Sequence, residues 1–328
     1  MMTAANEIAV TDRKLPGLAC ALNDEEMRRL LASALPHSFK GGGNLRVHHQ
    51  ILKHAPGKRC VIEYSLEADG KAPLRRRVIG KIYRKDRGRI IFENLRQLWE
   101  AAAAAGISFG MAEPLACLPE IGMVLQSRVP GRRLADFGMN EDLSVAVRAV
   151  AENLAALHGL AVSTSEKRGL DDHLRKYCHP GPEVLMASCP ESAPLVERLL
   201  AGLAKDGTLQ DAPICPVHGD LNLAQIFIAE ARAWFIDFDG FCLSHPALDL
   251  GNFLVTLQVY FGPDHERLAK QFLENYLKSR SHQMLTGLRA YQAFAYLRRA
   301  VICARAPAGP DWRQQVRQLL ETGNILLA

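Results

Sequence analysis

One stretch of the chain, residues 217–250, constrains the fold more than any other because it combines short apolar runs with acidic side chains. The apolar runs, residues 226–228 and 234–236, predict two strands, and the residues between them suit a hairpin turn. Asp220 lies ahead of the first run, and Asp237 follows the second. We therefore expect the segment that carries Asp220 and the segment that carries Asp237 to lie at the same end of one hairpin.

Such a concentration of polar groups suggests a binding or catalytic site. Carboxylates that lie close together repel one another and lose hydration, so they are usually kept for a metal, a proton transfer or a cation. Magnesium prefers hard oxygen ligands and takes only one or two of them from protein. A metal–phosphate site fits these acidic and amide side chains best. The alternative is a solvated turn, because Asp is common in turns for backbone reasons alone.

Three motifs in this stretch resemble those of a known family: H-G-D at residues 218–220, I-D-F at 236–238 and P-A-L-D-L at 246–250. The family is the small-molecule phosphotransferases with a protein-kinase-like fold, which include aminoglycoside kinases, choline kinases and several sugar kinases. The resemblance implies an α+β, bilobal fold. A small antiparallel-sheet N-lobe would cover residues 1–127, and a larger, mainly helical C-lobe would cover residues 128–328.

The same resemblance implies a role for each polar residue of the stretch. Asp220 would be the catalytic base, and Asp237 with Gln225 would hold Mg²⁺ against the phosphates of ATP. His218 and Asp249 would brace the loops. The family pattern has Asn where this chain has Gln225, and the longer side chain places the amide oxygen one methylene further out.

The N-terminal part of the chain predicts an antiparallel meander. Three strand-like runs occupy residues 45–52, 60–66 and 78–83, with Pro- or Gly-bearing loops between them. Lys81 lies on the third run, and Glu93 lies in the helical pattern that follows. They resemble the family's ion pair, in which the lysine holds the α and β phosphates. A lysine at a strand edge, facing water, is the alternative.

Two further nucleotide contacts follow from position. The turn at residues 54–59 lacks a G-x-G-x-x-G pattern, but Lys58, Arg59 and the backbone N–H groups of this turn are predicted to meet phosphate oxygens. A plain hairpin turn with solvated basic residues fits this segment equally well. In kinase-like folds the strand predicted at residues 123–126 leads to a hinge whose backbone binds adenine. The predicted adenine-edge residues are Gln126, Ser127, Arg128 and Val129.

Composition limits the class of protein. The formal net charge is only +5, and aromatic residues are 7% of the chain, so we expect no nucleic-acid partner. The eight cysteines form no C-x-x-C pair and are expected to be reduced thiols. No apolar run approaches the roughly 18 residues that span a bilayer, and the N-terminus does not resemble a signal peptide. We therefore expect no membrane association and a cytoplasmic location.

These observations together predict an ATP- and Mg²⁺-dependent kinase that phosphorylates a hydroxyl group of a small molecule, such as a sugar, an amino alcohol or an aminoglycoside-like compound. Residues 261–328 carry ten basic and five acidic residues, which favours a neutral or anionic acceptor. Asp237 and Asp249 are only twelve positions apart, too close for the activation segment of a protein kinase. A catalytically weak pseudokinase or nucleotide-binding scaffold is the alternative, and the oligomeric state is not predicted.

Overall fold

The computed structural model describes residues 12–35, 45–68, 74–84, 86–138, 141–164, 166–179 and 181–328. The chain divides into two compact units. The first unit comprises Met1–Ala104 and Met111–Val129, and the second comprises Ala105–Gly110 and Pro130–Ala328. The first unit ends at Val129, two residues after the predicted lobe boundary at residue 127. The segment Ala105–Gly110, which precedes this boundary in the sequence, belongs to the second unit.

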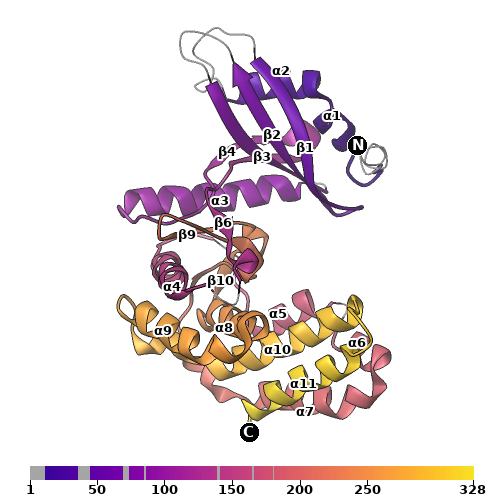
Figure 1. Cartoon of the computed structure of the whole chain (residues 1–328), viewed down its shortest axis with the longest axis vertical. Coiled ribbons are helices and arrows are strands. Elements are labelled where there is room, and N and C mark those ends of the chain that lie inside the picture. Colours follow the sequence, from indigo (N-terminus) through magenta and orange to yellow (C-terminus); the bar gives the residue numbers. More distant parts are fainter. Residues whose placement is uncertain are drawn as a thin grey trace. The chain divides into compact units, whose positions relative to one another are not determined.

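The first unit is built on a five-stranded sheet in the order β1-β2-β3-β5-β4, with all neighbouring strands antiparallel (Figure 1). The predicted meander is confirmed, because β1, β2 and β3 pair consecutively. Each of these three strands is longer than its apolar run in the sequence. The strands are β1 (Leu45–Ala55), β2 (Arg59–Ala68), β3 (Leu74–Tyr83), β4 (Pro114–Leu118) and β5 (Met123–Ser127).

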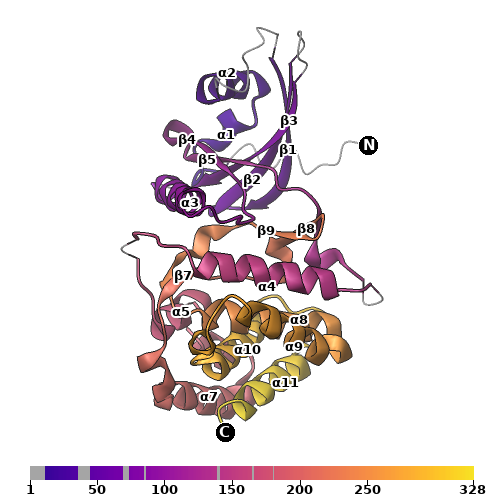
Figure 2. The same ribbon diagram turned by 90° about the vertical axis from the view of Figure 1, so that its left-hand side faces the viewer.

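Helices cover one face of this sheet (Figure 2). Met27 and Leu31 of α2 are fully buried in a core that also contains Ile62 of β2. The hydroxyl of Tyr64 donates a hydrogen bond to the carbonyl oxygen of Ala21 (2.7 Å), which ties the sheet to α1. The helices of this unit are α1 (Leu18–Ala21), α2 (Asp24–Ala34) and α3 (Arg87–Ala104).

The second unit is mainly helical, as predicted. Its long helix α10 contacts α7, α8 and α11, and the buried side chains of these helices form one apolar core. In the described ranges of the chain, no helix combines the length and the apolar character needed to cross a bilayer. The helices are α4 (Ser144–His158), α5 (Leu170–Tyr177), α6 (Glu183–Ser188), α7 (Ala193–Lys205), α8 (Ala247–Phe261), α9 (His265–Leu277), α10 (Leu288–Arg305) and α11 (Trp312–Ile325).

The predicted hairpin is also confirmed. Strands β8 (Ile226–Ala229) and β9 (Arg232–Phe235) pair antiparallel, and β6 (Arg132–Arg133) pairs with β8. Glu230 and Ala231 form the turn with positive φ angles of 49° and 61°, as expected for the turn type that matches the twist of a two-residue hairpin. Two further short strands, β7 (Cys215–Val217) and β10 (Cys242–Ser244), pair with each other, and β7 ends directly before the H-G-D motif.

Candidate active site

Asp249 anchors the loop that carries the H-G-D motif. Its carboxylate is completely buried near the start of α8. Oδ2 accepts a hydrogen bond from the backbone N–H of His218 (2.6 Å), and Oδ1 accepts one from the backbone N–H of Gly219 (2.9 Å). His158 lies 3.3 Å from Oδ2 through Nε2. The carboxylate therefore fixes the loop backbone directly ahead of Asp220.

His218 connects this loop to the I-D-F segment. Its ring is buried, and Nε2 lies 2.9 Å from the carbonyl oxygen of Ile236, so Nε2 carries the proton and donates it. Nδ1 then accepts the backbone N–H of Asp220 (3.3 Å). Gly219 has a φ of +81°, and a Cβ at this position would lie 2.3 Å from the carbonyl oxygen of Gly240. Only glycine permits the two loops to approach this closely.

Gln225 and Asp237 both lie at the open end of the hairpin, one directly before β8 and the other two residues after β9. The N–H of Ile236 donates to the carbonyl oxygen of Gln225 (3.0 Å), directly beyond the last strand pair. The side-chain Oε1 of Gln225 is buried and accepts no hydrogen bond from any described residue. Asp237 has a φ of +70°, a strained conformation for a non-glycine residue that is common at functional sites. Amide and carboxylate oxygens are ligands that a hard cation such as Mg²⁺ prefers, so Gln225 and Asp237 are the candidates to hold it.

Asp220 forms an ion pair that the sequence analysis missed. Nη2 of Arg298, on α10, contacts Oδ1 of Asp220. The guanidinium lies over the ring of Tyr177, with its Cζ 4.3 Å from the ring centroid. The side chain of Asp220 is 28% exposed and that of Arg298 is 14% exposed, so the pair is accessible from solvent. Arg298 is one of ten basic residues in the C-terminal segment, and nothing in the sequence distinguishes it from the others.

The predicted lysine and glutamate lie on β3 and α3 of the first unit. Lys81 is 7% exposed and lies in the middle of the sheet, opposite Val61 of β2 and Val124 of β5. Glu93 is 47% exposed and pairs with Arg96 on its own helix (2.7 Å). The hydrogen bond from Arg96 is the main reason why the pKa of the Glu93 carboxyl is lowered.

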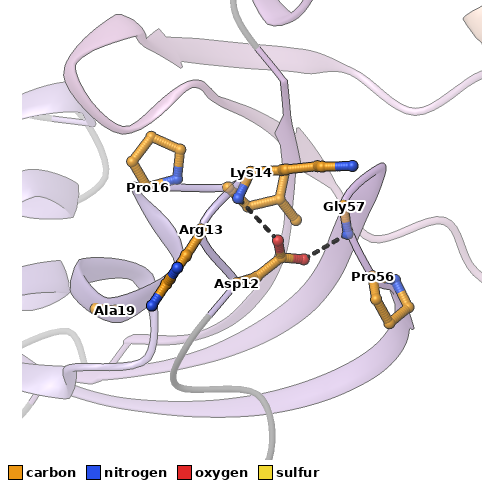
Figure 3. A pocket seen from close by; sticks show the side chains of 8 residues that line it. Asp12, Arg13, Lys14, Pro16, Ala19, Pro56 and Gly57 are labelled. Atoms are coloured by element: carbon orange, nitrogen blue, oxygen red, sulfur yellow. Dashed lines mark hydrogen bonds between the residues drawn. The ribbon is translucent and has the colours of Figure 1, made fainter.

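The turn that contains Lys58 corrects one expectation. The carboxylate of Asp12 accepts the backbone N–H of Gly57 (2.6 Å) and that of Lys14 (3.0 Å), as Figure 3 shows. The backbone N–H of Lys58 donates to Ala55 (2.9 Å). These two N–H groups of the turn are already bonded, so they do not meet phosphate as we had expected. The turn borders a cavity of about 800 Å³ beside Asp12.

The predicted adenine-edge residues lie at the end of β5. The backbone of Gln126 pairs with β3 on one side and β4 on the other. Ser127 is bonded to Glu113 through its backbone N–H (2.9 Å). The side chain of Arg128 forms an ion pair with the largely buried Glu63 (2.6 Å), and Val129 is buried.

Solved structures of kinases share this fold. Choline kinase from Cryptosporidium parvum Iowa II is 13% identical, with 92% of this chain and 94% of that chain covered and a TM-score of 0.63. A putative aminoglycoside phosphotransferase from Ralstonia eutropha JMP134 is 18% identical, with 92% and 98% covered and a TM-score of 0.62. A mutant of aminoglycoside phosphotransferase APH(4)-Ia, solved with AMP-PNP and hygromycin B, is 15% identical, with 92% and 98% covered and a TM-score of 0.59.

The fold is the protein-kinase-like, α+β fold of these solved kinases. No curated protein sequence matches the chain. The sequence pattern of the phosphotransferase enzyme family matches residues 68–294, which is more than half of the 328 residues. The chain belongs to this family, and it is accordingly a kinase that acts on a hydroxyl group of a small molecule.

Proposed function

We propose that the protein uses ATP and Mg²⁺ to phosphorylate its small-molecule acceptor. The observation that carries the proposal is the junction of two loops in the second unit. Asp249 and His218 tie the loop that bears Asp220 to the loop that bears Asp237. Relatives solved with ADP or AMP-PNP support an adenine nucleotide as the phosphoryl donor.

Each residue of the site has one task in the transfer. Asp220 orients the acceptor hydroxyl and takes its proton as the oxygen attacks the γ-phosphorus. Gln225 and Asp237 would hold Mg²⁺, which would supply positive charge to the phosphates. Such transfer depends mainly on positioning and charge stabilisation, and the hydrogen bonds of Asp249 and His218 supply the positioning.

The nucleotide contacts in the first unit are part of the same proposal. Lys81 holds the α and β phosphates and is oriented by Glu93, as the family resemblance implies. Lys58 contacts phosphate through its side chain, because the two backbone N–H groups at its turn are engaged. Adenine binds along residues 126–129, where the backbone of Gln126 and the N–H of Ser127 are engaged within the protein, so the base would meet the chain where Arg128 and Val129 follow β5.

The variant Asp220→Asn tests the proposal. It removes the proton acceptor while it keeps the shape of the side chain, so kcat should fall by at least about 100-fold. The affinity for Mg²⁺–ATP, measured by calorimetry, should change by less than about twofold, because no nucleotide contact is assigned to Asp220. The exposed residue Asp211 offers a matched control, and Asp211→Asn should leave both values unchanged. Full turnover in Asp220→Asn would contradict the assignment.

A further inference from the structure

A small pocket lies beside Asp220 in the second unit. Its volume is about 120 Å³, well below the roughly 300 Å³ at which pockets for drug-sized ligands begin. Part of its wall comes from the loop directly after Asp220, and the rest comes from α8 and α10. The polar residues that line it are Asn222, Asn252, Thr256, Arg298 and Arg299.

The pocket presents hydrogen-bond donors and positive charge. Arg298 and Arg299 bring two guanidinium groups, and none of the described lining residues is an Asp or Glu. Asn252 is 4% exposed, and its Nδ2 is buried without a hydrogen-bond partner in the described part of the chain. A buried donor that lacks an acceptor is unfavourable in a folded protein. An oxygen of a bound ligand would satisfy it.

Arg298 is held so that it can serve the base and a ligand together. The contact with Asp220 uses Nη2, and the Cζ of the guanidinium lies over the Tyr177 ring, 4.3 Å from its centroid. A guanidinium has five N–H donors, and its planar fork matches the two oxygens of a carboxylate or of a phosphate. Arg298 would therefore contact both Asp220 and an anionic group bound in the pocket.

We propose that the acceptor is a small hydroxy compound that carries an anionic group, either a carboxylate or a phosphate. Arg298, Arg299 and Asn252 bind the anionic group, and the hydroxyl of the same molecule faces Asp220. This inference rests on the proposed function. In the reaction, the hydroxyl oxygen bonds to the γ-phosphorus of ATP, the bond to the β–γ bridging oxygen breaks, the proton passes to Asp220, and ADP leaves.

Phosphorylation rates with matched acceptors test the inference. One arm compares hydroxycarboxylates with their carboxamides, and a second compares sugar phosphates with the free sugars, so the two arms distinguish carboxylate from phosphate. Cationic amino alcohols and aminoglycosides form the third arm. We expect kcat/KM for the anionic member of one pair to exceed that of its neutral analogue by about 100-fold or more. If neutral or cationic acceptors react best, the inference is wrong while the proposed function stands.

Variants on α10 identify the residues responsible. Arg299→Met should raise KM for the anionic acceptor by about 10-fold or more, leave kcat within about twofold, and hardly affect the neutral analogue. Arg298→Met should raise KM for the anionic acceptor and, because Arg298 also contacts Asp220, lower kcat for both acceptors; Arg298→Lys should restore part of the affinity. Arg289 is exposed on the same helix and outside the pocket, so Arg289→Met is the matched control. An equal loss for both acceptors in Arg299→Met would show a merely structural role and overturn the inference.

Direct binding provides a readout that does not depend on catalysis. Calorimetry with succinate and with inorganic phosphate, in the presence of saturating Mg²⁺–ADP, measures anion affinity without phosphoryl transfer. Binding of one of them that weakens in Arg299→Met and persists in Arg289→Met supports the inference. Absence of binding by both anions overturns it. The proposed function fails separately, when wild-type protein transfers phosphate to no acceptor of any arm.

Discussion

Replacement of the buried carboxylate of Asp249 should destabilise the second unit and inactivate the site. Asp249→Asn keeps the volume but exchanges one oxygen for an NH₂ group, whereas both oxygens now accept backbone N–H groups, from His218 and Gly219. At least one buried N–H loses its acceptor, and the remaining hydrogen bond loses its charge. These losses amount to about 2–4 kcal/mol of unfolding free energy.

Urea denaturation measures this change. With a denaturant dependence of about 3 kcal/mol per molar urea, the midpoint of the transition should fall by about 1 M. Hydrogen exchange should accelerate at the amides of His218 and Gly219, because their acceptor is the group altered. The exposed control Asp211→Asn should change stability by less than about 0.5 kcal/mol. A midpoint for Asp249→Asn within about 0.2 M of wild type would refute the reasoning.

Two further predictions concern backbone fit and pH. Gly219→Ala should lower activity and stability much more than Gly309→Ala. Both glycines have positive φ, but of these two only Gly219 would place a Cβ against a backbone oxygen, at 2.3 Å. Equal losses for the two variants in activity assays and thermal melts would exclude this close approach as the cause. Burial, aided by nearby cationic groups, lowers the pKa of His173 from 6.5 to about 3. In the unfolded chain His173 therefore takes up a proton near pH 6.5, whereas in the folded protein it stays neutral down to about pH 3. The stability that is present above pH 6.5 is lost as the pH falls towards about 3. As the pH falls from about 8 to about 5, protonation of this histidine in the unfolded chain should lower the unfolding free energy by about 2 kcal/mol. In urea titrations, His173→Gln should show a correspondingly smaller pH dependence of stability. An unchanged pH dependence would contradict the assignment.

The sheet and the hairpin could be predicted because their signals are local. Apolar runs of strand length alternate with turn residues over residues 45–83, and the same pattern recurs at residues 226–236. The placement of Gln225 and Asp237 at one end of the hairpin could be predicted too, since residues at the open end of two paired strands are neighbours. The braces His218 and Asp249 were inferred only through the family resemblance.

Contacts between distant segments could not be predicted. The Arg298–Asp220 pair joins residues 78 positions apart, and a basic residue on an amphipathic helix has no local signal for its partner. The Asp12–Gly57 hydrogen bond similarly depends on how the N-terminal segment packs against the first turn of the sheet. The backbone N–H groups at this turn were therefore assigned to phosphate, although protein acceptors already bind them.

The structure of the protein with Mg²⁺ and a non-hydrolysable ATP analogue tests the central claim most directly. The account predicts a metal ion bound by a carboxylate oxygen of Asp237 and by Oε1 of Gln225, at about 2.0–2.1 Å from each oxygen. It also predicts the γ-phosphate on the side of the metal that faces Asp220. A metal–nucleotide complex that leaves both Gln225 and Asp237 without a metal contact would contradict it.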